Sequence, residues 1–180
     1  MSIQNNNQML VSEVMMLLDQ IAVIGESVIM KEALEEMGRS HLGIACIVDD
    51  KNKLLGLLTD GDIRRKLLKV QKPFSALLVD DALEHAIRSP VTTLPNDKLV
   101  HAIGLMGQKK IWDLPVVDEQ GTLVGLLHLH PAIQALLGID IVIGNLKHLT
   151  PSHRRDKHNL IVLAKTIRHG FKCSINGHFH

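Results

Sequence analysis

Apolar and polar positions follow a regular order along residues 21–69. Three short apolar runs have the composition of strands: Ile21 to Ile24, Gly43 to Val48 and Leu54 to Leu58. Between the first two runs, apolar residues recur every three or four positions, which predicts an amphipathic helix from about Val28 to Arg39, capped by Ser27. A hairpin turn at Asp49 to Asn52 and a closing helix from about Gly61 to Lys69 complete a βαββα unit.

The same order returns at a constant offset of 69 residues without a gap. Leu54-Leu55-Gly56-Leu57-Leu58 reappears as Leu123-Val124-Gly125-Leu126-Leu127. The predicted strands of the second copy are Val91 to Leu94, Leu114 to Val117 and Leu123 to Leu127. The predicted helices run from about Asp97 to Lys109, capped by Asn96 or Asp97, and from about His130 to Leu137. The hairpin turn is predicted at Asp118 to Gly121.

This tandem repeat predicts an α/β (α+β) fold. A three-stranded sheet has a face that must be covered, so we expect the two units to pack sheet to sheet with pseudo-twofold symmetry and two clefts between them. The predicted organisation is a flexible N-terminus at 1–8, repeat one at 9–70, a linker and repeat two at 71–140, and an extension at 141–180.

Composition and charge set the extension apart from the repeats. Residues 1–140 carry 13 Lys and Arg against 18 Asp and Glu, a formal charge of −5, whereas residues 141–180 carry 7 against 1, a formal charge of +6. Six of the eleven histidines also lie in this basic, His-rich extension. We expect a cytoplasmic protein, because no signal peptide pattern and no membrane-length apolar run is found.

Candidate chemistry is concentrated in the turn from Thr59 to Arg65. The start of a helix offers unpaired amides and a partial positive charge to an anion. Asp62 can accept hydrogen bonds from a ribose diol, and Thr59 can bond a hydroxyl or a phosphate oxygen. A phosphate partner would explain a basic pair, Arg64 and Arg65, at the helix end where acids are preferred. The alternative is that Thr59, Asp60, Gly61 and Asp62 form an ordinary turn and helix cap.

The second copy differs at the equivalent positions. His128 replaces the threonine, and Pro131 replaces the acid, so this cleft lacks its hydroxyl-binding carboxylate. His128 and His130 are candidates for proton-sensitive or phosphate-binding groups, and Trp112 for stacking on a base. The alternatives are partly buried rim histidines and a core or interface tryptophan. No catalytic set and no metal-ligand spacing is present, so we expect neither an enzyme nor a metal site.

The ungapped repeat and the Gly-x-x-Thr-x-x-Asp turn over residues 9–140 resemble a pair of CBS domains, named for cystathionine β-synthase. Three segments resemble the CBS pair at the C-terminus of bacterial arabinose-5-phosphate isomerases: Val11 to Met15, Gly56 to Arg65 and Gly125 to His130. The turn is also similar to CBS pairs fused to sugar-nucleotidyltransferases. Pro131 departs from the isomerase pattern, which has an Asp there.

The resemblance implies a regulatory module, without a required cofactor, that senses AMP, ADP, ATP or a CMP-sugar. It implies that Thr59 and Asp62 hold the ribose and that Arg64 and Arg65 lie near phosphate. The wall of the base site would come from two strands: Gly43, Ile44 and Ala45, and Ala22 and Val23. A homodimer, a partner enzyme of activated-sugar or lipopolysaccharide-precursor metabolism, and no membrane partner are expected.

The extension leaves an alternative function open. The repeats would then only dimerise, without a ligand, and residues 141–180 would dock a partner. The basic run in this extension is not interleaved with aromatic residues, which argues against nucleic acid as that partner.

Overall fold

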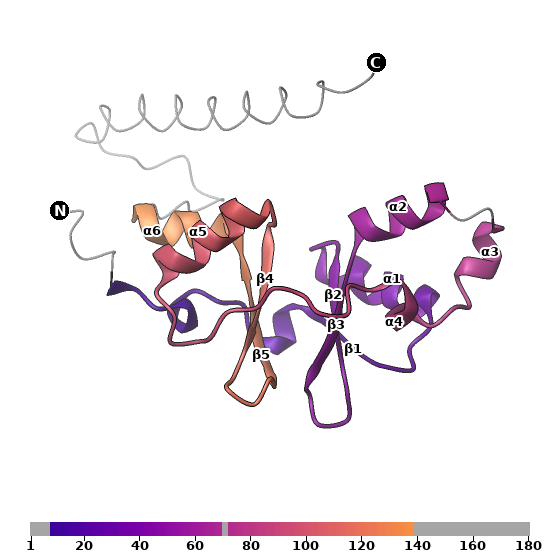
Figure 1. The fold of residues 1–180 in the computed structure, drawn as a ribbon, viewed down its shortest axis with the longest axis horizontal. Coiled ribbons are helices and arrows are strands. Elements are labelled where there is room, and N and C mark those ends of the chain that lie inside the picture. Colours follow the sequence, from indigo (N-terminus) through magenta and orange to yellow (C-terminus); the bar gives the residue numbers. More distant parts are fainter. Residues whose placement is uncertain (1–7, 70–71, 139–180) are drawn as a thin grey trace, which may run out of the picture. The chain divides into compact units, whose positions relative to one another are not determined.

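The computed structural model describes residues 8–69 and 72–138, and it contains two sheets, each flanked by helices (Figure 1). In the first sheet the strand order is β1-β2-β3, with β2 parallel to β1 and antiparallel to β3. The elements of the first repeat are β1 (Ala22–Gly25), α1 (Met30–Ser40), β2 (Ile44–Val48), β3 (Leu54–Thr59) and α2 (Asp60–Lys69). The predicted βαββα order of this repeat is therefore confirmed.

The second repeat has the same order of helices and the same hairpin register. Its elements are α5 (Leu99–Lys109), β4 (Asp113–Val117), β5 (Leu123–His128) and α6 (Leu129–Leu137). Asp113 pairs with His128 as Ile44 pairs with Thr59, at the offset of 69 seen in the sequence. The short helices that lie outside this order, among those whose bounds fall within the described residues, are η2 (Val11–Glu13), η3 (Leu18–Gln20), α3 (Phe74–Leu77) and α4 (Ala82–His85).

The strand predicted at Val91 to Leu94 is wrong, because only a single parallel bridge forms there, between Thr93 and Val116. The Thr93 amide donates to the Pro115 carbonyl at 3.1 Å, and the Val117 amide donates to the Thr93 carbonyl at 3.0 Å. Extending the ladder in either direction would need amide donors at Pro95 and Pro115, which prolines lack. Two prolines thus reduce the strand to one residue.

The predicted caps of the two long helices are also wrong. Helix α1 has Ile29 at its N-cap position, not Ser27, and α5 has Lys98, not Asn96 or Asp97; neither cap residue makes a side-chain capping bond. The first amide of α1, from Met30, donates to the Asp80 carbonyl at 2.8 Å. Backbone carbonyls from distant segments therefore satisfy donors that a local side chain would otherwise cap.

Each repeat is completed by a segment that precedes the other repeat in the chain. Ile87, in the linker, bridges Leu57 in β3, and Met16, in the N-terminal segment, bridges Leu126 in β5. The linker also supplies Ala82 and Leu83 to the first core, while Val11 is part of the second core. We call residues 9–16 and 80–87 the crossing segments.

The glycines of the repeated pentapeptide make room for the crossing segments. A Cβ on Gly56 would lie 3.2 Å from the Ala86 Cβ and 3.3 Å from the Ile87 carbonyl oxygen. A Cβ on Gly125 would lie only 2.6 Å from the Met16 carbonyl oxygen. The Leu-x-Gly-Leu-Leu pattern is therefore explained by the close approach of a backbone to each strand.

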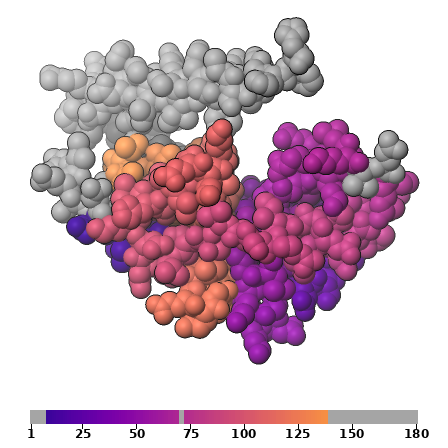
Figure 2. All heavy atoms as spheres, in the orientation of Figure 1, coloured from indigo at the N-terminus to yellow at the C-terminus, as the bar shows by residue number. Residues whose placement is uncertain are grey.

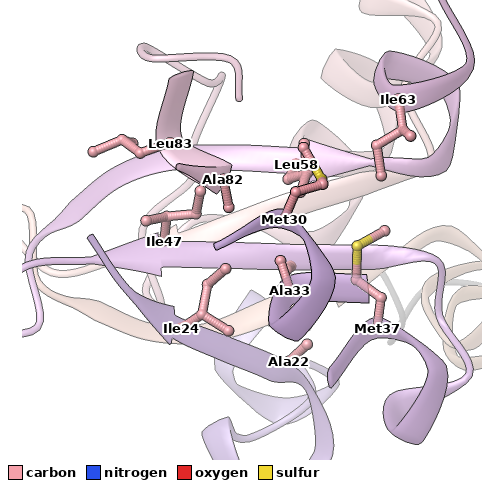
Figure 3. Close-up of a cluster of buried hydrophobic side chains, with 11 residues drawn as sticks. Ala22, Ile24, Met30, Ala33, Met37, Ile47, Leu58, Ile63, Ala82 and Leu83 are labelled. Atoms are coloured by element: carbon pink, nitrogen blue, oxygen red, sulfur yellow. The ribbon is translucent and has the colours of Figure 1, made fainter. Parts of the chain in front are cut away.

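The two faces of the first sheet are buried in different ways. One face packs under α1 and α4 in a cluster that includes Ala22, Met30, Ala33 and Leu58 (Figure 3). The other face packs against the second sheet, in a cluster shared between the repeats: Ile21, Ile44, Cys46, Val48, Leu57, Leu123 and Leu126. This shared cluster confirms the predicted packing of sheet on sheet.

The two hairpin turns also meet. The Leu54 amide donates to the Gly121 carbonyl at 3.1 Å, and the Leu123 amide donates to the Asn52 carbonyl at 2.8 Å. Figure 2 shows the two turns side by side. The predicted basic extension at 141–180 and residues 1–7 of the predicted N-terminal segment 1–8 lie outside the described residues. Over the described ranges, no helix has the length and apolar character needed to cross a membrane.

Candidate ligand site at the start of helix α2

Thr59 and Asp62 form one hydrogen-bonded unit across the turn between β3 and α2. The Thr59 hydroxyl donates to the Asp62 Oδ2 at 2.6 Å and accepts from the Asp62 amide at 3.2 Å. This is the capping arrangement that the sequence offered as an alternative. This arrangement uses only part of the hydrogen-bonding capacity of the Asp62 carboxylate, because a carboxylate has about four lone-pair sites. The Thr59 hydroxyl therefore orients Asp62 and leaves it able to accept further hydrogen bonds.

Arg65 folds back over this turn and pairs with the second oxygen of Asp62. The Asp62 side chain is 13% exposed, whereas that of Arg65 is 58% exposed. Gly61 leaves space for this arrangement, since a Cβ there would lie 3.2 Å from the Arg65 Nη1. Arg64 is exposed. A guanidinium thus lies over the start of α2, which adds to the partial positive charge of the helix end.

Asp60 lies over Gly43 on the other side of the turn. The Asp60 amide donates to the Gly43 carbonyl at 3.0 Å, and a Cβ on Gly43 would collide with the Asp60 carboxylate. Gly43 also has a φ of +66°, a conformation that glycine adopts without strain. A pocket of about 290 Å³ opens here, lined by Leu34, Met37, Gly38, His41, Gly43 and Asp60.

The predicted wall residues divide between the two faces of the first sheet. Ile44 and Val23 belong to the cluster between the sheets, so they lie on the inter-repeat face. Ala22 and Ala45 belong to the cluster under the helices. A ligand between the repeats would therefore meet the side chains of Val23 and Ile44, but only the backbone of Ala22 and Ala45.

In the second repeat, the three residues singled out by the sequence come together. The ring centroids of His128 and His130 are 5.6 Å apart, and those of Trp112 and His130 are 6.3 Å apart. The interplanar angles are 26° and 27°, so the three rings form a stack. Trp112 is 41% exposed.

Sequence analysis missed a fourth member of this group, Asp113. Its Oδ1 lies 2.8 Å from the His128 Nδ1. The available signal was the offset of 69, which places Asp113 opposite His128 just as Ile44 lies opposite Thr59. The charge of the Asp113 carboxylate also affects a group in the first repeat, the Cys46 thiol. Burial raises the pKa of the Cys46 thiol to about 12, and Asp113 adds to that rise.

Within residues 8–69 and 72–138, no three His, Cys, Asp or Glu side chains are grouped so that they could hold a metal ion. Asp60 and Asp62 are separated by their partners, since Asp60 lies against Gly43 and Asp62 is bonded to Thr59 and Arg65. The arrangement at α2 offers carboxylate lone pairs to hydroxyl groups and a guanidinium to anionic groups.

Comparison with known proteins decides the family. The CBS domain model matches residues 11–69 and 79–135. The chain belongs to the CBS domain family. The first match includes residues 11–16 of the first crossing segment and the turn at Thr59, and the second includes the whole crossing segment 80–87 and the turn at His128.

Among relatives, an uncharacterized protein of Helicobacter pylori (strain J99) is 35% identical over 63% of this chain and 33% of its own length. Arabinose 5-phosphate isomerase KdsD of Yersinia pestis is 31% identical over 69% of this chain and 37% of its own length. The chain thus spans about a third of the length of these curated relatives.

Among solved structures, CBSX2 of Arabidopsis thaliana in complex with AMP is similar to this CBS pair. The two share 26% of their residues with a TM-score of 0.63, and the match covers 72% of this chain and 97% of CBSX2. The CBS pair described above therefore has the fold of a protein that binds AMP.

Proposed function

We propose that this CBS pair is a regulatory module that binds an adenine nucleotide at the turn from Thr59 to Arg65. The observation that carries the proposal is the Thr59–Asp62 unit, in which a hydroxyl at 2.6 Å holds a carboxylate at the start of a helix. A similar CBS pair, CBSX2, holds AMP. In this proposal the chain binds and does not catalyse.

The contacts give each residue a part in binding. Asp62 has lone pairs left for the ribose hydroxyls, because each of its oxygens accepts one side-chain bond. The start of α2 and the Arg65 guanidinium favour a phosphate beside the turn. Arg64 supplies a second positive charge there, while Val23 and Ile44 contribute an apolar wall on the inter-repeat face.

In this proposal the ligand lies between the repeats, and regulation follows from that position. A ligand that binds one arrangement of the two sheets more tightly than another shifts the population towards it. We propose that the protein is a cytoplasmic homodimer, and that this change in its conformation alters its interaction with a partner enzyme. The similarity to KdsD supports a partner in sugar-phosphate metabolism, and therefore a CMP-sugar as the competing ligand to test.

The experiment is a calorimetric titration of the full chain with AMP, ADP, ATP and a CMP-sugar. Asp62→Ala should weaken binding of the recognised ligand by about tenfold or more, because a hydrogen bond to a charged group contributes about 1.5–3 kcal/mol. Asp97→Ala is the matched control. Asp97 also accepts from a threonine hydroxyl, that of Thr93 at 2.7 Å, but it lies in the second repeat.

Two results would contradict the proposal. Tight binding that is unchanged in Asp62→Ala would show that the ligand does not bind at this turn. The absence of binding to all four ligands would contradict the proposed sensing function. The second result would favour a ligand-independent module, which the charge of −5 on residues 1–140 and +6 on residues 141–180 supports. In that case, deletion of 141–180 should abolish partner capture.

A further inference from the structure

The two acids of the turn from Thr59 to Arg65 are bonded differently. Asp62 is held by Thr59 and Arg65, whereas the exposed carboxylate of Asp60 has no hydrogen-bond partner within residues 8–69 and 72–138. We infer that Asp60 determines how many phosphates the site accepts, so that the site selects a nucleoside monophosphate over the diphosphate and the triphosphate. This inference rests on the proposed function and adds to it which class of adenine nucleotide is bound.

Asp60 lies beside the space into which a longer phosphate chain would extend. Asp62 and the guanidinium of Arg65 lie on one side of the turn, and Asp60 lies over Gly43 on the other. The pocket of about 290 Å³ opens on this second side, and Asp60 is one of its lining residues. A nucleotide with its first phosphate at the start of α2 therefore has this pocket next to it as room for a second phosphate.

The charges around this pocket are unfavourable to an added phosphate. Helix α1 ends at Ser40, and Gly38 and His41, at that end, both line the pocket. The C-terminal end of a helix carries a partial negative charge, because its last carbonyls have no partner within the helix. Neither a lysine nor an arginine is among the six lining residues. A second phosphate would thus meet both a carboxylate and the negative end of a helix.

Comparison of the repeats shows that the fold does not need an acid at this position. The residue equivalent to Asp60 at the offset of 69 is Leu129. Its amide donates to the Trp112 carbonyl at 2.9 Å, as the Asp60 amide donates to the Gly43 carbonyl at 3.0 Å. As an acid in the first turn, Asp60 does stabilise the start of α2 through its charge. That role alone would not make the site distinguish one phosphate from three.

The experiment compares the dissociation constants of AMP, ADP and ATP for the full chain, measured by calorimetry without divalent cations. The wild type should bind AMP about tenfold or more tightly than ATP, with ADP between them. Asp60→Asn removes the charge and keeps the size, so it should reduce this preference by about three- to tenfold, mainly through tighter ATP binding. The change should shrink at about 0.5 M salt, where the Debye length is only about 4 Å.

Matched variants separate selection by Asp60 from effects of stability and of net charge. Asp60→Leu installs the residue of the second repeat, and it should reduce the preference as Asp60→Asn does. Asp50→Asn removes an exposed carboxylate at the opposite end of β2 and β3. Roughly 20 Å of strand separates this position from Asp60, well beyond the Debye length of about 10 Å at 0.1 M salt. The preference of Asp50→Asn should therefore equal that of the wild type.

The outcomes distinguish this inference from the proposed function. Equal affinities for AMP, ADP and ATP, all weakened by Asp62→Ala, would overturn selection by Asp60 and leave the nucleotide site in place. So would ATP binding that is tighter than AMP binding and is weakened by Arg64→Ala, because the phosphate chain would then run towards the arginines. A preference that is unchanged in both Asp60 variants, or is lost in His41→Asn instead, would also overturn the inference. If none of the three nucleotides binds, both the inference and the proposed nucleotide site fail.

Discussion

Ile87 exchanges two backbone hydrogen bonds with Leu57, at 2.8 and 3.0 Å, although it lies in the linker 30 positions further along the chain. Met16 and Leu126 are related in the same way in the second repeat, at 2.8 and 3.0 Å. The strand held by Ile87 ends at Thr59. Each repeat is therefore hydrogen-bonded to the segment that precedes the other repeat in the chain, close to the candidate ligand turns.

Gly125→Ala should destabilise the protein more than Gly56→Ala. The added Cβ at 125 would lie 2.6 Å from a backbone oxygen of Met16, which cannot move without breaking the Met16–Leu126 bridge. At 56 the nearest atoms are at 3.2–3.3 Å. We expect losses of about 3 and about 1 kcal/mol in the free energy of unfolding, measured by urea denaturation.

Gly104→Ala is the matched control, since nothing lies within 4 Å of a Cβ at this position in α5. It should stabilise the protein by about 0.5–1 kcal/mol, because alanine is the better helix former. Equal effects of all three substitutions would contradict the assigned role of the pentapeptide glycines.

Arg65→Ala should weaken AMP binding by about tenfold and leave adenosine binding unchanged. The guanidinium lies over the start of α2, where the proposal puts the phosphate, and a charge-assisted bond of this kind contributes about 1.5–3 kcal/mol. Arg39→Ala removes an arginine that pairs with Glu36 three residues earlier on α1, the same spacing as Arg65 and Asp62. It should alter neither affinity, and loss of adenosine binding in Arg65→Ala would place that residue elsewhere in the site.

Asp118→Asn should reduce the sensitivity of the protein to acid. The Thr122 amide, at 2.8 Å, leads the causes that hold the pKa of the Asp118 carboxyl below its ordinary value, and the Gln120 amide adds to them. The stabilisation is therefore complete above the unfolded pKa of about 4 and is lost as pH falls towards the folded pKa.

Thermal unfolding between about pH 3 and about pH 6 measures this effect. Asparagine keeps an oxygen acceptor for the turn but does not titrate, so the variant should lose less stability on acidification than the wild type. Glu119→Gln, at the exposed next position, serves as the control. An acid profile for Asp118→Asn that parallels the wild type would refute the prediction.

Cys46 should not react with a thiol reagent at about pH 8 while the protein is folded, because burial raises the pKa of its thiol to about 12. The assay uses Cys173→Ser so that one thiol remains. Reaction should begin only on denaturation. Because the unfolded thiol ionises at lower pH than the folded one, stability should also fall as the pH rises above about 8.5. Rapid labelling of the native protein would contradict the burial of this strand.

The sequence by itself determined the repeat, the helices and the hairpins, because these depend on local periodicity and on turn residues a few positions apart. It also placed Thr59 and Asp62 on one turn, and the offset of 69 placed His128 and Pro131 at the equivalent positions of the second repeat. The stacking of Trp112 and His130 with His128 became evident only in the structure. Asp113 escaped attention because its partner His128 lies 15 positions away, across a hairpin.

Only the tertiary structure decided which carbonyls cap α1 and α5, why Val91 to Leu94 forms a single bridge, and where the crossing segments lie. These features join residues 23 to 110 positions apart, such as Thr93 with Val116 and Met16 with Leu126, so no local pattern encodes them. The crossing segments are offset by 71 and not 69, as the Met16 and Ile87 bridges show, so their equivalence is hidden in the sequence. Their glycine contacts are backbone contacts, and these become visible only when the chain has folded.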